Sequence, residues 1–249
     1  MVTFARMWRE NSKKMVLLSL LIVISSSQCA LTQEINTKNK ENKVSVISTL
    51  NDYKTSVKID TLKRMVAISK YITPLFTEWK YATTDNFTNK ILYRHPIAYA
   101  RLKVVLALQK VQKQLASLGL SLTFFDAYRP WSVTKKMWEI VHDERYAANP
   151  AKGSNHNRGA AVDVSLVKIA NGEPLPMPTE FDDFTEKAHH DFSDLSKEIL
   201  ENRRILKAVM EQNGFIALPT EWWHYSFPNA AQQFEVLNLN FKKLSKLQR

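Results

Sequence analysis

Cysteine is nearly absent from this 249-residue chain, which carries only Cys29. If a leader is removed after that residue, the mature protein has no thiol and forms no disulfide. Any metal site in it must then use histidine and carboxylate ligands, and its stability must come largely from an apolar core. The composition supplies such a core, because 45% of the residues are hydrophobic and 24% are charged, as in ordinary globular proteins. The length suits one large domain or two small ones.

Long runs of like charge are also lacking, although the formal net charge is +11. The Lys and Arg residues are scattered along the chain and do not form the clusters typical of nucleic-acid-binding proteins. We therefore interpret the positive balance as a property of a soluble surface and expect no nucleic-acid partner. The sequence contains no internal repeat and no low-complexity tract.

The hydrophobic run near the N-terminus, residues 15–24, is too short for a membrane span, which takes about 20 apolar residues. Small residues follow it, and four basic residues precede it: Arg6, Arg9, Lys13 and Lys14. This order predicts a secretory signal peptide over residues 1–29, export across the inner membrane to the periplasm, and no membrane span after cleavage. Lipid attachment at Cys29 is a less favoured alternative, because Gln28 is bulky where lipoprotein signals have a small residue. An uncleaved anchor is the third possibility.

The remaining chain is interpreted as an N-terminal extension, residues 30–74, and a main domain, residues 75–249. The extension begins with a polar leader. Two short strands are predicted after the leader, at 44–48 and 55–59, and a short helix at 63–71.

The main domain mixes helices and strands irregularly. Apolar positions at three- and four-residue steps predict helices over 96–119, 132–148 and 194–214. Ser132 and Asp194 are the predicted N-caps of the second and third of these helices. Apolar runs predict strands at 122–125, 160–167, 215–218 and 222–227. The last two strands are separated by a short turn, which favours an α+β fold with an antiparallel central sheet flanked by helices.

The first candidate site lies in the loop and strand of residues 153–163. His156 and Asp163 are seven residues apart, and Gly159 and small alanines between them allow the backbone to bend so that both side chains reach one ion. By itself this spacing is a weak signal.

A second imidazole and a second carboxylate follow in Glu221 and His224. With His156 and Asp163, His224 makes a set of three ligands, and a catalytic zinc needs three protein ligands and a fourth position for water. Glu221 is left over and is suited to be the general base. Residues three apart on a strand face opposite sides, so Glu221 must lie on the turn after Pro219 to share the side of His224.

Arg129 ends an apolar strand, between Tyr128 and Pro130. Composition alone favours a surface arginine. The functional alternative is a fixed guanidinium that stabilises an oxyanion. The adjacent pair His189 and His190 has no carboxylate at a spacing that would complete a metal site. We therefore expect these two residues to lie around the site at most, and not to bind the metal.

Five motifs occur in order along the chain: Lys80 to Phe87, Asp126 to Pro130, Ser154 to Asp163, Phe181-Asp182, and Glu221 to Tyr225. Together they resemble the zinc D-alanyl-D-alanine dipeptidases of the vanX type, peptidase family M15. The resemblance covers about residues 75–228. It departs from the family pattern at Pro178, where the family usually has glycine.

The resemblance implies that residues 75–249 form a catalytic domain with the D,D-peptidase and hedgehog-like zinc fold. It also implies one Zn²⁺ per subunit and a small D-dipeptide as substrate. By position, the resemblance implies that His156, Asp163 and His224 bind zinc. It implies that Glu221 acts as base and later as acid, and that Arg129 stabilises the tetrahedral intermediate. Tyr81 and Ser154 would line the substrate pocket, and Asp182 would receive the ammonium group of the substrate. It does not specify the oligomeric state.

The predicted reaction is hydrolysis of D-Ala-D-Ala by zinc-activated water, with Glu221 as general base. Export favours turnover or salvage of wall-derived dipeptides over interception of cell-wall precursors. One alternative is a D,D- or L,D-carboxypeptidase acting on muropeptides. Another is a catalytically silent, zinc-containing module that binds peptidoglycan, which would need neither Glu221 nor Arg129 and would usually close its fourth metal position.

Overall fold

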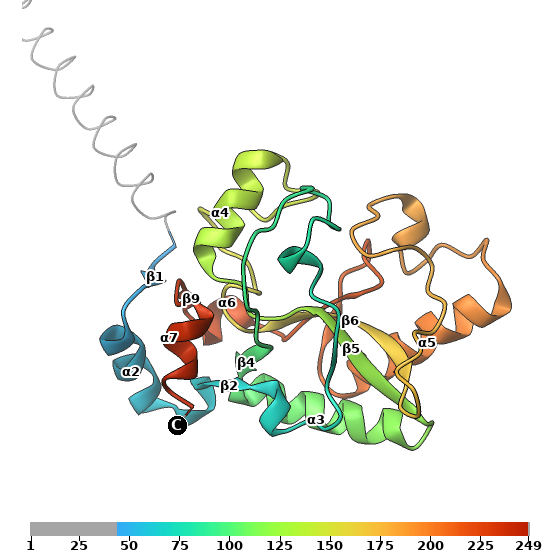
Figure 1. Ribbon diagram of the computed structural model, residues 1–249, viewed down its shortest axis with the longest axis horizontal. Coiled ribbons are helices and arrows are strands. Elements are labelled where there is room, and N and C mark those ends of the chain that lie inside the picture. The colour runs from blue at the N-terminus through green and yellow to red at the C-terminus, as the bar shows by residue number, and fades with distance from the viewer. Residues whose placement is uncertain (1–43, 249) are drawn as a thin grey trace, which may run out of the picture. The chain divides into compact units, whose positions relative to one another are not determined.

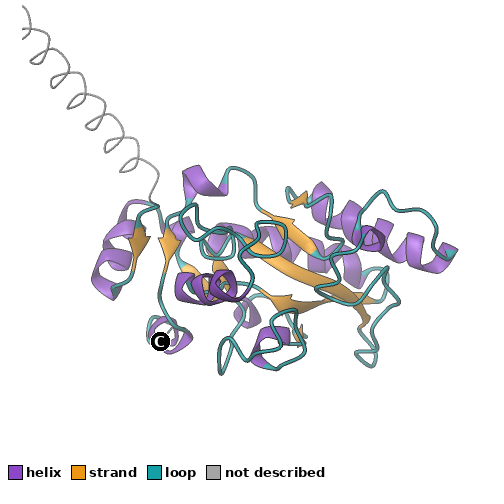
Figure 2. Cartoon of the chain, turned by 90° about the horizontal axis from the view of Figure 1, so that it is seen from above, coloured by secondary structure: helices purple, strands orange, loops and turns teal. Residues whose placement is uncertain are grey.

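A mixed five-stranded sheet runs through the middle of the protein, in the strand order β3-β5-β6-β8-β7 (Figure 2). The computed structural model describes residues 44–248, so the predicted signal peptide lies outside the described residues. The strands are β3 (Phe76–Thr77), β5 (Leu120–Asp126), β6 (Ala161–Lys168), β7 (Ile216–Ala217) and β8 (His224–Ser226). Strand β3 is parallel to β5, whereas the β5–β6, β6–β8 and β8–β7 pairs are antiparallel. The α+β prediction is confirmed, with one parallel edge strand added.

Helices α3 (Leu102–Ala116) and α5 (Lys197–Gln212) contact each other and pack against β5 and β6 (Figure 1). The side chains that α3 buries recur at three- and four-residue steps: Val104, Val105, Leu108, Val111 and Leu115. Burial of such a stripe is the main source of helix stability in a protein. Both central strands are buried along almost their whole length, as expected for strands covered on two faces.

The predicted start of the first of these helices, at Pro96, is wrong. Residues 96–101 instead lead into β4 (Tyr99–Arg101), which pairs antiparallel with β2 (Met65–Ala67). The Arg101 side chain is fully buried and donates to the carbonyl oxygens of Lys63 and Arg158, at 2.7 and 2.8 Å. These long-range bonds hold the segment extended, and no local pattern reveals them.

The other predicted helix bounds also shift. Helix α4 (Trp131–Ile140) follows Pro130 and ends well before Ala148. Helix α5 is capped by Ser196, whose hydroxyl accepts from the Ile199 N–H, and not by Asp194.

The predicted strand at 55–59 is wrong, because these residues belong to α2 (Leu50–Ile59). The Thr49 hydroxyl accepts from the Asp52 N–H and starts this helix, and Tyr53 buries its ring. The predicted helix at 63–71 is also wrong, since that segment holds β2 between the 3-10 turns η1 (Thr61–Lys63) and η2 (Ile68–Lys70).

The predicted strand at 44–48 is present as β1 (Val46–Ile47), which pairs in parallel with β9 (Val236–Leu237). Six residues of the N-terminal part are buried in the same core as the sheet: Tyr53, Met65, Val66, Ala67, Ile68 and Ile72. The remaining short elements are η3 (Lys80–Ala82), η4 (Glu186–Ala188), α6 (Ala230–Gln233) and α7 (Phe241–Ser245). Among residues 44–248, no helix combines the length and the apolar character that a membrane crossing requires.

Two glycines give a matched test of the packing beside the candidate loop. Both have positive φ, but a Cβ at Gly159 would lie 2.7 Å from the buried Met65 side chain, whereas a Cβ at Gly119 would have nothing within 4 Å. We expect Gly119→Ala to lower the free energy of unfolding by about 1–2 kcal/mol through backbone strain alone. Gly159→Ala should cost a further amount of about 1–3 kcal/mol from overpacking.

Urea unfolding of both variants and the parent checks this prediction. Equal losses at the two positions would mean that the Met65 side chain moves aside without cost.

Candidate active site

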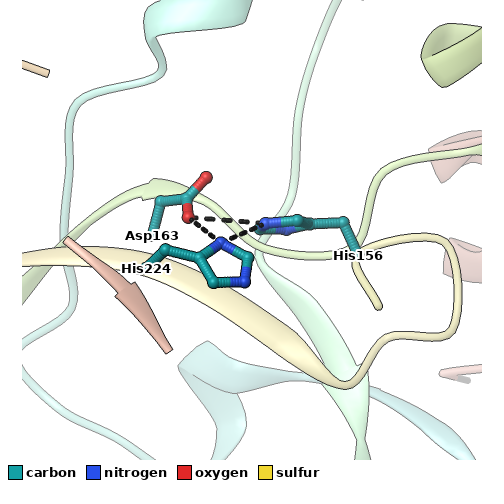
Figure 3. Close-up of side chains that lie close together, drawn as sticks. All are labelled: His156, Asp163 and His224. Atoms are coloured by element: carbon teal, nitrogen blue, oxygen red, sulfur yellow. Dashed lines mark hydrogen bonds and ion pairs between the residues drawn. The ribbon is translucent and has the colours of Figure 1, made fainter. Parts of the chain in front are cut away.

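Three side chains from two strands and one loop converge at one end of the sheet (Figure 3). The Nδ1 atom of His224 lies 2.9 Å from Oδ1 of Asp163 and 3.2 Å from Nε2 of His156, and the latter nitrogen lies 3.4 Å from the same Asp163 oxygen. One ligand atom from each residue lies within 4.8 Å of the others, so the three fit around a single metal ion.

The sheet itself positions two of these side chains. Asp163 on β6 is directly opposite His224 on β8 in the antiparallel ladder. Directly opposed residues have neighbouring Cβ atoms on one face, so this register brings the carboxylate and the imidazole together.

The loop that carries His156 is built around Asn157. Its side-chain amide donates to the Arg129 carbonyl at 2.8 Å and accepts from the Ser154 N–H at 3.0 Å. Gly159 has φ +66°, a conformation that glycine adopts without strain. The backbone therefore turns sharply between His156 and β6, as the small residues in the sequence predict.

Hydrogen bonding fixes the protonation of His156. Its Nδ1 lies 2.8 Å from the Ala127 carbonyl oxygen, which can only accept, so Nδ1 carries the proton. The lone pair of Nε2 then points at the centre of the site, as a neutral histidine ligand requires. Burial alone would raise the pKa of Asp163, but the neighbouring His156 and His224 outweigh it and lower this pKa below its ordinary value. The donor set thus suits a divalent transition-metal ion.

Arg129 is buried, so the interpretation as a surface arginine is wrong. Its Nε and Nη2 atoms lie 2.8 and 2.7 Å from Oδ2 of Asp126, and the hydroxyl of Tyr93 donates to the other oxygen of that carboxylate at 2.9 Å. The guanidinium also lies over the Tyr81 ring, 4.8 Å from its centroid, and 3.9 Å from Asp163 Oδ2. These contacts hold the positive charge of Arg129 in a fixed position beside the His–Asp–His group.

Asp182 lies in the wall of the same cavity. The Tyr81 hydroxyl donates to its Oδ1 at 3.0 Å, and the Phe87 N–H donates to its Oδ2 at 3.4 Å. Burial, together with the charge of Asp163, raises the pKa of Asp182 to about 7. Such a carboxyl group is poised to ionise when a cation approaches it.

Glu221 lies on the turn before β8 and outside the strand, as predicted. Its N–H donates to the Leu218 carbonyl at 3.1 Å, and its carbonyl accepts from the His224 N–H at 3.3 Å. Burial raises the pKa of Glu221 to about 7. A carboxyl group with this pKa can accept and return a proton near neutral pH.

One cavity of about 310 Å³ contains all eight residues that the sequence singled out: Tyr81, Arg129, Ser154, His156, Asp163, Asp182, Glu221 and His224. Neither His189 nor His190 lines it.

Sequence reasoning gave no role to several residues that shape this cavity. Asp126 and Tyr93 support Arg129, and Asn157 supports the histidine loop. Tyr146 and Phe184 both line the cavity and contact each other, with ring centroids 5.0 Å apart. Asp126 belongs to the motif Asp126 to Pro130, so the sequence could have indicated its role. The two aromatic residues lie in loops without any periodic pattern, and nothing in the sequence indicates theirs.

A His–Asp–His group that shares a cavity with a titratable carboxyl group and a fixed guanidinium is the arrangement that a metallopeptidase needs. The family model for D-ala-D-ala dipeptidase, Peptidase_M15, matches residues 62–244. The chain belongs to this family.

Two relatives have the same description. The chain is 33% identical over 167 residues to the D-alanyl-D-alanine dipeptidase of Escherichia coli (strain K12), covering 67% of this chain and 86% of the relative. It is 32% identical over 182 residues to the D-alanyl-D-alanine dipeptidase of Enterococcus faecium, covering 63% and 90%.

Solved structures are more distantly similar. The LdcB LD-carboxypeptidase has a TM-score of 0.35 and 16% identity, covering 69% of this chain and 89% of the other. VanYB in complex with D-alanine-D-alanine has a TM-score of 0.35 and 15% identity, covering 54% and 75%.

A half-buried histidine, His190, lies outside the cavity. Within the described residues, both ring nitrogens of His190 are buried and have no hydrogen-bond partner. Its ring faces Tyr225, at a centroid distance of 6.2 Å. Burial, aided by the cations of Lys207 and Arg203, lowers the pKa of His190 to about 4.

His190 should therefore make the protein less stable as the pH falls from about 6.5 toward 4, because the unfolded chain binds a proton there that the folded chain does not. We expect His190→Phe to lack this loss, so its melting temperature relative to the parent rises as the pH falls through that window. Calorimetry from pH 7 to pH 4 measures the difference. His142→Phe serves as the control, and a His190→Phe curve that stays parallel to the parent curve would contradict the prediction.

Proposed function

We propose that this protein is a zinc-dependent dipeptidase that hydrolyses D-Ala-D-Ala. The observation that carries the proposal is the placing of the Asp182 carboxyl group in the same cavity as the His–Asp–His group and Glu221. A fixed anion at a short distance from the reacting carbonyl favours a substrate with a free amino group close to the scissile bond. The descriptions of the relatives agree with this substrate.

His156, Asp163 and His224 would hold the zinc ion, each through one of the converging atoms. When bound, zinc polarises a carbonyl group and lowers the pKa of a water ligand toward neutrality. With only three protein ligands, such an ion would keep a position for that water, as catalytic zinc sites do.

Glu221 would act first as base and then as acid. With a pKa near 7 it accepts a proton from the attacking water and returns it to the nitrogen of the leaving D-alanine. Backbone hydrogen bonds to Leu218 and His224 hold the turn of Glu221, and its side chain lines the same cavity as the His–Asp–His group.

Arg129 would stabilise the negative charge that develops on the carbonyl oxygen. Its two bonds to Asp126 orient the guanidinium before substrate binds, so little reorganisation is needed during the reaction. Asp182 would bind the substrate ammonium, with Tyr81 fixing the carboxylate and Ser154 lining the pocket nearby.

We also propose that residues 1–29 direct export, so that the enzyme acts on wall-derived dipeptides outside the inner membrane. Fractionation of cells that produce the tagged protein tests this. Recovery only in the cytosolic fraction would contradict export.

A carboxypeptidase acting on muropeptides is the second candidate. A neighbouring cavity of about 470 Å³ shares Asn155, Leu218 and His224 with the first, which provides room for a longer peptide. Activity on acetyl-D-Ala-D-Ala, which lacks the free amine, distinguishes the two functions. A silent binding module is less consistent with the site, because Glu221 and Arg129 both face the cavity.

Replacing Glu221 with Ala should leave zinc bound and reduce kcat for D-Ala-D-Ala by about 10²–10⁴-fold, because the proton acceptor is lost. D-Alanine release and metal analysis of the purified protein measure the two effects. Glu139→Ala, at an exposed position on α4, is the control and should keep full activity. An unchanged rate in the Glu221 variant would remove this residue from the mechanism.

Asp182→Asn should lower kcat/KM for D-Ala-D-Ala by about 10–100-fold, as expected for loss of a partly buried ion pair worth roughly 1.5–3 kcal/mol. The effect on acetyl-D-Ala-D-Ala should be small, so the preference for a free amine should shrink. Asp183→Asn, one residue along the same loop, provides the matched control. If the variant discriminates between the two substrates as strongly as the parent, the amine is recognised elsewhere.

A further inference from the structure

The outer nitrogen of each metal-site histidine has an oxygen partner, but the two partners differ. His156 directs Nδ1 outward, to the Ala127 carbonyl. The imidazole ring of His224 has the opposite orientation. Its Nδ1 faces Asp163, and its Nε2 points outward and lies 3.0 Å from the hydroxyl of Ser226. A backbone carbonyl survives any substitution, whereas the partner of His224 depends on one side chain.

The strand geometry explains this contact. Ser226 is two residues after His224 on β8, so both side chains lie on the same face of the strand. Tyr225 points to the opposite face, where it contacts His190.

Ser226 is itself held in place. The side-chain amide of Asn155 donates to Ser226 Oγ at 3.1 Å. A hydroxyl oxygen has two lone pairs, so Ser226 can accept from Asn155 and from a protonated Nε2 of His224 at the same time. Asn155 directly precedes His156, and the chain of bonds therefore joins the loop of one ligand to the strand of the other.

A competing interaction makes this support important. Oδ1 of Asp163 lies 2.9 Å from Nδ1 of His224, and a carboxylate oxygen at this distance can accept a hydrogen bond from a proton-bearing Nδ1, a form of the ring that could not ligate through that nitrogen. Neutral imidazole carries one proton, so an acceptor at Nε2 favours the form whose Nδ1 lone pair is free.

We propose that Ser226, held by Asn155, is a positioning residue that keeps His224 ready to bind the metal through Nδ1. The proposal rests on the metal site of the proposed function. It adds a residue pair that acts on the metal site through its bond to His224.

The test is the zinc dissociation constant of the purified full-length protein, measured by competition with a chromophoric chelator. Ser226→Ala should weaken zinc binding by about 10–100-fold, the usual effect of removing a hydrogen-bond partner of a ligating histidine. Ser226→Thr keeps the hydroxyl and should restore the affinity to within about threefold of the parent, since threonine suits a strand.

Ser165→Ala is the control, because Ser165 is a serine of the same sheet but lies on β6 against a different cavity. Its zinc affinity should equal that of the parent. The unfolding midpoints of the metal-free variants show whether each is folded, and the Co²⁺-loaded absorption spectrum of Ser226→Ala should change while that of Ser226→Thr should not.

Asn155→Ala should weaken zinc binding less than Ser226→Ala, and the double variant should be no weaker than Ser226→Ala, because the two residues act through one bond to His224. The proposal is overturned if Ser226→Ala binds zinc as tightly as the parent, or if Ser226→Thr is as weak as Ser226→Ala.

These results separate the inference from the proposed function. If zinc affinity falls as expected but the parent does not cleave D-Ala-D-Ala, the positioning role stands and the dipeptidase function fails. If the parent cleaves the dipeptide and Ser226→Ala retains its zinc affinity, only the positioning role fails.

Discussion

The register of three neighbouring strands is the constraint on which the site depends. Asp126 on β5, Asp163 on β6 and His224 on β8 are successive partners across the sheet. A slip of one residue would turn Asp163 to the other face, away from His224. The fully buried side chains of Val162 and Val164 oppose such a slip, because it would exchange their place with that of a carboxylate. Core packing therefore also fixes the geometry of the chemistry.

The same register sets two carboxylates side by side, since Asp126 is the partner of Asp163. Like charges placed opposite each other are destabilising. Arg129 relieves this by bonding Asp126 at 2.7 Å while lying 3.9 Å from Asp163. Its guanidinium also covers the ring of Tyr81, whose hydroxyl bonds Asp182. One chain of contacts thus connects the group that would recognise the amine to the group that would stabilise the oxyanion.

The sequence was sufficient where the relevant pattern is local. The apolar runs at 122–125 and 160–167 predicted the two central strands, and the ordered motifs named eight residues that share one cavity. It was insufficient where a distant partner decides the conformation. Residues 55–59 are rich in β-branched side chains, yet a cap at Thr49 and burial of Tyr53 make them helical.

Arg129 shows the same limit within the site itself. A single arginine at a strand end has no local feature that predicts burial. Its environment depends on Asp126, on the Tyr81 ring and on an Asn157 side chain that binds its carbonyl oxygen. The parallel pairing of β3 with β5 is likewise a contact between segments more than 40 residues apart, which periodicity does not report.

The absence of sulfur ligands has a consequence for the conditions under which the site can work. Its converging atoms are two imidazole nitrogens and one carboxylate oxygen, and residues 44–248 contain no cysteine. Peroxides and disulfide exchange act on thiolates and leave these donor groups unchanged. Acid is a different matter, since protons compete with a metal for both imidazoles. The site should thus be indifferent to the redox state of its surroundings and sensitive to their acidity.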